Sequence, residues 1–293
     1  MNYHPLLPDT LLGEPEFFRK KLPEILFRSV RPEQSWLPPD SPSLNASAVL
    51  FLLGILPETE GDICLILNKR SRKVRQPGDL CCPGGGITPF LDRFLAALLR
   101  LPGLHLRSWP CWSLLQRNCP PTARCLAHFL ATGLREGWEE MHLHPAGVSL
   151  LGPLLPEHLV LFRRAIYPLA VWVDRQEIFR PNREVEKILR LPLRDLLQPV
   201  HYATFRLEYP PHISNKLRRK QQDFLCFLFE DRGETEMLWG ATFRIVLNFL
   251  RIVFDFHPPG TQKLPLIHGS MKKSYLHGRP KKQETLSLRF PSE

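Results

Sequence analysis

The chain has 293 residues, of which 43% are hydrophobic and 23% are charged. This length and composition are those of a globular protein that can bury one sizeable core with additions to it. The sequence contains no run of about eighteen apolar residues, which excludes a helix that spans a membrane.

Net charge and cysteine content further narrow the class of protein and the kind of partner. The 39 basic and 29 acidic residues give a formal net charge of +10, which suits a polyanionic partner. The basic residues lie in separate clusters, so we expect a small-molecule partner and neither nucleic acid nor a membrane. Seven cysteines without a CxxC pair argue against a zinc site and a disulfide framework. The N-terminus lacks the pattern of a secretory signal, so we predict a cytoplasmic location.

The first 43 residues predict a helical preamble and a linker. Glu14-Pro15-Glu16 opens a helix that runs to about Phe27, because apolar residues recur there at helical spacing. Proline-rich residues 38–42 then break regular structure. Residues 44–56 and 63–68 are apolar enough for two strands, and the turn between them predicts a hairpin.

A glycine-rich segment follows the hairpin. Leu80-Cys81-Cys82 predicts a short strand, and Pro83-Gly84-Gly85-Gly86 predicts a loop. Glycine tolerates positive φ and allows a ligand to approach the backbone closely. Three glycines alone are weak evidence for a phosphate loop, so their functional interpretation depends on the helix downstream.

Residues 93–131 predict an insertion between these glycines and that helix. Residues 88–101 carry apolar side chains at helical spacing, whereas residues 102–121 are rich in Trp, Cys and Pro and predict an irregular crossing. From Leu126 to Met141 the apolar spacing stays in phase, so the end of the insertion and the downstream segment share one helix. Four roles are open for the insertion: a lid over the site, a partner surface, a small cap, or an extra packing layer.

The helix around Thr132–Leu143 carries the chemistry. Glu136, Glu139 and Glu140 share one face, because residues three and four apart are neighbours on a helix. Clustered carboxylates suit Mg²⁺ or Mn²⁺, which recruit phosphates, and the alternative is a solvated acidic face. We expect the opposite face to pack into the core; it comprises Leu126, Leu130, Leu134, Trp138 and Met141.

The rest of the chain alternates strands with a long helix. Strands are predicted at 148–155, 165–173, 188–192, 201–209 and 223–230, and the last two are expected to pair. A turn of helix at 193–197 is expected after the third of these strands. A helix is predicted at 238–254, and the residues from Pro258 onward predict a mobile tail. The order predicts an α/β fold, an α/β/α sandwich around a mixed sheet. Its main domain spans 44–257, between the preamble (1–43) and a basic tail (258–293).

Two segments together resemble the Nudix box of the Nudix hydrolases. The box reads Gly-x5-Glu-x7-Arg-Glu-U-x-Glu-Glu-x-Gly-U, where U is a bulky aliphatic residue. Its counterparts are Pro83-Gly84-Gly85-Gly86 and Arg135-Glu136-x-x-Glu139-Glu140. Three features depart from the box: Asp92 stands for the first Glu, 42 residues (93–134) replace seven, and Gly137 and His142 replace the aliphatic residue and the last glycine.

Other segments are similar to the coenzyme A diphosphatase branch of that family. They are Asn68-Lys69-Arg70-Ser71, Val74-Arg75, the stretch 185–193, and Trp239-Gly240-Ala241-Thr242. The resemblance covers residues 45–252. It implies the Nudix fold and an enzyme that hydrolyses the diphosphate bond of coenzyme A or a related nucleoside diphosphate derivative, with Mg²⁺ or Mn²⁺ as cofactor.

The resemblance also implies site residues. The catalytic set is Arg135, Glu136, Glu139 and Glu140. The three glutamates would hold the cation, with Asp92 as a further ligand if the insertion returns it to the helix. Arg135 would pair with a neighbouring carboxylate and orient it.

Substrate would meet residues upstream and downstream of the helix. Arg70 and Arg75 are candidates for gripping phosphates, because arginine offers bidentate geometry. Gly84 and Gly85 are expected to line the substrate site. A carboxylate after residue 183, either Glu184 or Glu186, is a candidate general base.

Three functions remain open on sequence grounds. The first is a coenzyme A diphosphatase, which the 68–75 segment favours. The second is the same fold acting on ADP-ribose, dinucleotides or RNA 5′ ends. The third is a non-catalytic Nudix-like binding module. The intact carboxylate cluster weighs against the third, because such a cluster is costly without a cation.

Overall fold

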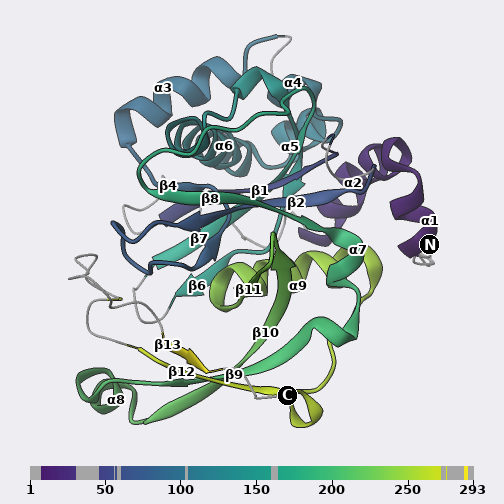
Figure 1. Ribbon diagram of the computed structural model, residues 1–293. Helices are drawn as coiled ribbons and strands as arrows, with labels where there is room; N and C mark the ends of the chain where they lie inside the picture. The colour runs from purple at the N-terminus through teal and green to yellow at the C-terminus, as the bar shows by residue number, and fades with distance from the viewer. Residues whose placement is uncertain are drawn as a thin grey trace.

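The computed structural model describes residues 8–30, 46–55, 57, 61–102, 105–159, 164–271, 275 and 287–289. A mixed eight-stranded sheet lies between two layers of helices, and a five-stranded sheet lies beyond one of these layers (Figure 1). The predicted α/β/α sandwich is therefore confirmed, and the second sheet is an addition to it. No helix in the described ranges is both long and apolar enough to cross a membrane.

The main sheet has the order β3-β2-β1-β7-β5. Its strands are β1 (Ala46–Gly54), β2 (Cys64–Arg70), β3 (Leu80–Cys81), β4 (Gly84–Gly86), β5 (Val148–Pro153), β6 (Glu157–Leu159), β7 (Arg164–Val173) and β8 (Val185–Pro192). The predicted hairpin is confirmed, because β1 and β2 pair antiparallel. β1 pairs parallel with β7 on its other side, which makes the sheet mixed.

Both faces of β1 are buried, which explains its unbroken apolar run. Leu50 and Leu52 pack in one core cluster with α6 (Pro120–Met141). Phe51 and Leu53 pack in another cluster with α2 (Pro15–Val30) and α9 (Gly240–Phe254). The ring centroids of Phe51 and Phe249 are 4.6 Å apart. Alternation along the strand thus attaches both helical layers to the sheet.

The N-terminal preamble is part of this packing. α1 (Pro8–Gly13) and α2 contribute buried residues to the same cluster as β1 and α9. Phe18 is fully buried, and its ring stacks against that of Phe254 at 6.1 Å. The predicted linker at 38–42 lies outside the described residues.

The insertion forms more helix than predicted. α3 (Pro89–Leu99) confirms the inserted helix, and α6 runs unbroken from Pro120 through the acidic segment, as the in-phase spacing predicts. The prediction of an irregular crossing is wrong, because α4 (His105–Ser108) and α5 (Trp112–Asn118) form there. Leu106, Trp109, Trp112 and Leu115 recur every three residues and are buried. They pack beside α6 as an extra layer, and the prolines nearby obscured this spacing in the sequence.

The predicted mobile tail also needs correction. β12 (Leu266–Ser270) pairs parallel with β9 (Tyr202–Glu208) and antiparallel with β13 (Ser287–Arg289). β10 (Gln221–Asp231) and β11 (Glu234–Leu238) complete this sheet. β9 and β10 pair antiparallel, as expected, and α8 (Pro211–Leu217) lies in the connection between them. The partner of β12 lies far away in the sequence, so local composition could not reveal the strand. Leu193–Leu196 (α7) forms the predicted helical turn after β8.

Candidate active site

The glycine segment returns to the acidic helix despite the insertion. β4 pairs with β1 and thereby runs alongside α6. Arg135 Nη2 donates to the Gly86 carbonyl oxygen at 3.0 Å. A Cβ built on Gly85 would lie 2.5 Å from Cδ of Glu136. The two halves of the motif therefore meet in space.

Two of these glycines are required for different reasons. Gly84 has φ +147°, and a Cβ there would lie 2.3 Å from the Ala48 carbonyl oxygen, so no L side chain fits. At Gly85 the obstacle would be the Glu136 carboxyl group, the end of a flexible side chain. Gly84 thus lets the backbone turn, whereas Gly85 leaves room for a carboxylate.

Asp92 lies fully buried against α6 and Arg135. Arg135 Nε donates to its Oδ1 at 2.7 Å, and the Thr88 N–H and Thr132 Oγ1 donate to its Oδ2 at 2.7 and 2.8 Å. Burial opposes the charged form, but these donors outweigh it and hold the pKa of Asp92 below its ordinary value. The structure thus places Asp92 as a hydrogen-bonded partner of Arg135, and its role as a cation ligand stays a prediction.

Arg135 in turn holds two of the glutamates. Its Nη1 lies 3.0 Å from Glu136 Oε1 and 3.2 Å from Glu139 Oε1. The Glu136 side chain is 19% exposed, whereas that of Glu139 is 53% exposed. Burial raises the pKa of Glu136, and the nearby Arg135 charge opposes this. Arg135 therefore joins the glycine segment, Asp92 and the acidic face in one unit.

Glu140 faces the other side of the cluster. Its Oε2 accepts hydrogen bonds from Asn68 Nδ2 at 3.0 Å and from the Gly84 N–H at 3.2 Å. Burial raises its pKa to about 7, and the charge of Glu136 adds to this. The Gly84 and Asn68 hydrogen bonds and the Arg70 charge only partly offset it. The Glu140 anion is thus under-compensated and would gain from a cation.

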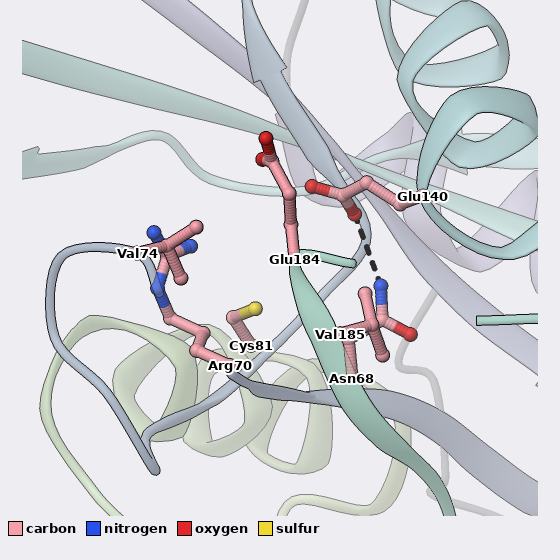
Figure 2. A pocket seen from close by; sticks show the side chains of 7 residues that line it. All are labelled: Asn68, Arg70, Val74, Cys81, Glu140, Glu184 and Val185. Atoms are coloured by element: carbon pink, nitrogen blue, oxygen red, sulfur yellow. Dashed lines mark hydrogen bonds between the residues drawn. The ribbon is translucent and has the colours of Figure 1, made fainter. Parts of the chain in front are cut away.

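A pocket opens beside Glu140 (Figure 2). It is lined by Asn68, Arg70, Val74, Cys81, Glu140, Glu184 and Val185. Figure 2 shows the carboxyl groups of Glu184 and Glu140 at one end of the pocket, with Arg70 across from them. Of the two candidate bases, Glu184 lines the pocket, whereas Glu186 lies 3.7 Å from Lys69.

Glu184 is held there by contacts that the sequence did not reveal. The Asn182 N–H donates to the Glu140 carbonyl oxygen, and Asn182 Nδ2 donates to that of Glu139, both at 2.8 Å. The Ser71 N–H donates to the Glu184 carbonyl oxygen at 2.8 Å. The 182–184 segment is therefore tied both to the end of α6 and to the end of β2.

The two candidate arginines differ. Arg70 lines the pocket, and its Nε donates to the Arg75 carbonyl oxygen at 2.8 Å. The Arg75 side chain is exposed and does not line the pocket. The structure thus brings Arg70, but not Arg75, to the candidate site, and the backbone of Arg75 positions Arg70.

The end of α6 explains one departure from the motif and corrects one prediction. His142 adopts φ 54°, the left-handed conformation in which helices commonly end on glycine, and its N–H bonds the Trp138 carbonyl. Trp138 was expected in the core but is 47% exposed, next to the His142 and His144 rings. It lies at the edge of the apolar arc of α6, beyond Leu134 and Met141.

The donor set fits a divalent cation in its chemistry. Glu136, Glu139 and Glu140 offer hard oxygen ligands, and Asn68 adds an amide Oδ1 that is buried without a hydrogen-bond partner. In the described ranges, no three His, Cys, Asp or Glu side chains stand close enough to enclose an ion. Arg135 between Glu136 and Glu139 accounts for this spacing, and the exposed Glu139 side chain has room to turn.

Comparison with known proteins bears on this geometry. No family model matches the chain. The chain is 24% identical over 204 residues to the peroxisomal coenzyme A diphosphatase NUDT7 of Mus musculus, which covers 68% of this chain and 67% of the mouse protein. The motif residues, the fold and this relative all indicate the same family. The chain is similar to the Nudix hydrolases, and within them to the coenzyme A diphosphatase branch.

Several solved structures that are similar to this chain carry the names of Nudix hydrolases or of an Ap4A hydrolase. A MutT/nudix family protein from Enterococcus faecalis has a TM-score of 0.37 and 11% identity, over 82% of this chain and 74% of that one. A C. elegans Ap4A hydrolase has a TM-score of 0.34 and 13% identity, over 52% and 82%. RenU, a Nudix hydrolase from M. smegmatis, has a TM-score of 0.33 and 12% identity, over 52% and 73%.

Gly85→Ala is expected to impair hydrolysis by this protein without unfolding it. The added methyl group would displace the Glu136 carboxyl group, because its Cβ would lie 2.5 Å from Cδ. We expect kcat/KM to fall by about tenfold or more, as a misplacement of 1 Å costs up to about 10²-fold. Steady-state kinetics with matched thermal melts measure this.

Gly86→Ala is the matched control, because no atom lies within 4 Å of a Cβ built there. Equal activity of the Gly85 and Gly86 variants would contradict the assigned contact with Glu136.

Proposed function

We propose that this chain is a Nudix hydrolase that splits the diphosphate bond of coenzyme A, or of a related nucleoside diphosphate derivative, with Mg²⁺ or Mn²⁺ as cofactor. The observation that carries the proposal is the pocket in which Arg70 faces the carboxylates of Glu140 and Glu184. An arginine suits the phosphates and carboxylates suit a cation and a base, so the pocket has the groups that diphosphate hydrolysis needs.

The cation would be held by Glu136, Glu139 and Glu140, with the unpartnered Asn68 Oδ1 beside them. When bound, Mg²⁺ or Mn²⁺ would neutralise phosphate charge and activate water for attack on phosphorus. Arg135 has a positioning role in the proposal, because it contacts Glu136, Glu139 and Asp92 at once. Asn68 and the Gly84 N–H hold Glu140 in place.

Glu184 is the proposed general base. Water forms a bond to one phosphorus, the P–O bond of the anhydride breaks, and the second phosphate leaves with its oxygen. Glu184 takes the proton of the attacking water, and its position in the pocket with Glu140 supports this role. Arg70 holds the negative oxygens of the diphosphate during attack.

Glu184→Gln is expected to lower kcat by about 10²–10⁴-fold with little change in KM, because removal of a general base affects the chemical step. Glu186→Gln is the matched control: Glu186 lies two residues away, beside Lys69. Steady-state kinetics of both variants over pH 5–9 test the assignment. A larger loss for Glu186→Gln would transfer the role to that residue.

Coenzyme A is the substrate that we propose first, for two reasons. The segment Asn68–Ser71 resembles that branch, and three of its residues contact the site: Asn68, Arg70 and Ser71. The mouse relative is a coenzyme A diphosphatase by name. The alternatives are ADP-ribose, dinucleotides, RNA 5′ ends, or binding without catalysis.

A hydrolysis screen of the full chain separates these outcomes. Coenzyme A, ADP-ribose, NADH, diadenosine polyphosphates and a 5′-triphosphate RNA are incubated with Mg²⁺ or Mn²⁺, and the products are resolved by chromatography. We expect coenzyme A to give the highest kcat/KM, with adenosine bisphosphate and phosphopantetheine as products. A higher value for another compound would reassign the substrate, and no turnover of any would favour a binding module.

The proposal includes the predicted cytoplasmic location. A fluorescent fusion of the full chain would test it by imaging. Peroxisomal signal, which the name of the mouse relative describes for that protein, would be the contrary outcome.

A further inference from the structure

α3 carries two apolar faces, and only one of them is covered. Asp92, Ala96 and Leu99 are buried toward α6. The other face, together with Leu101 two residues past the end of the helix, forms an exposed row that we name the α3 ridge. It consists of Phe90 (91% exposed), Phe94 (62%), Leu101 (50%), Leu91 (45%) and Leu98 (39%). Single exposed apolar residues are ordinary, but a contiguous set of this size marks an interaction surface.

The ridge runs along the helix. Phe90, Phe94 and Leu98 recur every four residues and therefore lie in one line. Figure 1 shows α3 at the outside of its helical layer, away from the main sheet. The ridge thus lies on the surface of the folded chain rather than at a seam between its layers.

The charge around the ridge has one sign. Residues 93–134 contain no Asp or Glu. The basic residues of this segment are all exposed arginines, namely Arg93, Arg100, Arg107, Arg117 and Arg124. Arg93 lies on α3 and Arg100 is its C-cap. Both lie at one flank of the ridge, about 60° and about 80° of helical rotation from Phe90, on the side away from Phe94. Arg107 Nε donates to the Arg100 carbonyl oxygen at 3.2 Å, which adds a third arginine at that end.

We propose that the α3 ridge docks on an anionic phospholipid surface. Phenylalanine and leucine would enter the boundary between headgroups and acyl chains, while the flanking arginines contact lipid phosphates. This proposal departs from the expectation, drawn from the sequence, that the chain has no membrane partner. The absence of a spanning helix in the described residues concerns insertion across a membrane, not binding to its surface. This surface does not use the residues of the diphosphate pocket, so the proposal stands or falls apart from the proposed substrate.

The charge argues against a second copy of the chain as the occupant. Two ridges facing each other would bring the arginines at positions 93, 100 and 107 of both copies together, without an acidic residue of this segment to pair with them. Like charges at an interface are unfavourable, whereas an anionic lipid surface attracts them.

The test is flotation of the full chain with vesicles. Wild type is mixed with neutral phosphatidylcholine vesicles and with vesicles that contain 30% phosphatidylglycerol, in about 0.1 M and about 0.5 M salt. We expect at least about tenfold tighter binding to the anionic vesicles, weakened at the higher salt. Equal binding to neutral and anionic vesicles, or none to either, would overturn the proposal.

Variants locate the surface. Phe90→Ser with Phe94→Ser is expected to weaken vesicle binding at least tenfold, and Arg93→Glu with Arg100→Glu to abolish the preference for anionic lipid. Ile178→Ser with Val200→Ser is the matched control, because these residues are 74% and 82% exposed elsewhere. Thermal melts verify that each variant folds, and the exposure of Phe90 and Phe94 argues that they will.

Analytical ultracentrifugation without lipid examines the competing occupant. Three results together would identify a second copy of the chain, instead of a lipid surface, as the occupant of the ridge. Wild type would form a dimer, the variant with Phe90→Ser and Phe94→Ser would be a monomer, and wild type would not bind vesicles.

Discussion

Glu140→Gln is expected to lower kcat/KM by about 10²–10³-fold or more while leaving the fold intact. The glutamine oxygen can still accept from Asn68 Nδ2 and the Gly84 N–H, so charge is the main property that changes. Loss of one preorganised electrostatic contact commonly costs this much. Steady-state kinetics with Mg²⁺ measure the effect, and near-normal activity would show that the acidic face is only solvated.

The same variant should change how stability depends on pH in ion-free protein. Burial raises the pKa of Glu140 to about 7 from 4.5, so between these values the folded state binds more protons than the unfolded state. The free energy of unfolding therefore falls as pH rises through that window, by up to about 3 kcal/mol. Glutamine removes this decline, so at pH 8 in EDTA the variant should melt higher than wild type.

Mg²⁺ supplies the control for this result. It is expected to raise the Tm of wild type at pH 8 but not that of Glu140→Gln. Equal stabilisation of both proteins would contradict a cation ligand at position 140.

Arg135→Met is expected to lower the free energy of unfolding by about 3–5 kcal/mol, because it leaves the buried Asp92 carboxylate without its cation. It also leaves Glu136 and Glu139 close together without Arg135 Nη1 between them. Urea denaturation measures the change. Arg124→Met, at an exposed position on the same helix, is the control and should change stability by less than about 0.5 kcal/mol.

A double variant identifies the cause. Adding Asp92→Asn to Arg135→Met should recover part of the loss, since the uncompensated charge is removed and the Thr88 and Thr132 donors can still bond the amide oxygen. Additive losses from the two substitutions would show that Asp92 and Arg135 act independently.

Periodic patterns made most of the fold predictable. The spacing of Glu136, Glu139 and Glu140 is local, and so is the apolar phase from Leu126 to Met141 that reveals α6 as one helix. The strands and the long α9 followed from apolar runs in the same way. Such patterns depend only on neighbours along the chain, so one sequence is enough to find them.

Features that depend on distant partners were missed. β12 exists because β9 lies beside it, and Asn182 holds the end of α6 through backbone carbonyls that any sequence would supply. The motif suggested Asp92 as a ligand, but the donors that occupy its oxygens come from positions 88, 132 and 135. Arg70 and Arg75 looked alike in sequence, and only the turn between them determines which one reaches the pocket.

The contact between Asp92 and Arg135 also affects the order of folding. It joins residues 43 apart, whereas in the ordinary box the two groups are close in sequence. Closing the longer loop costs about 1.5 kcal/mol more in chain entropy, and the contact must wait until the insertion has collapsed onto α6. The β1–β2 hairpin can form without this collapse, because its strands are adjacent in the chain. We therefore expect the acidic face to be assembled after the β1–β2 hairpin has formed.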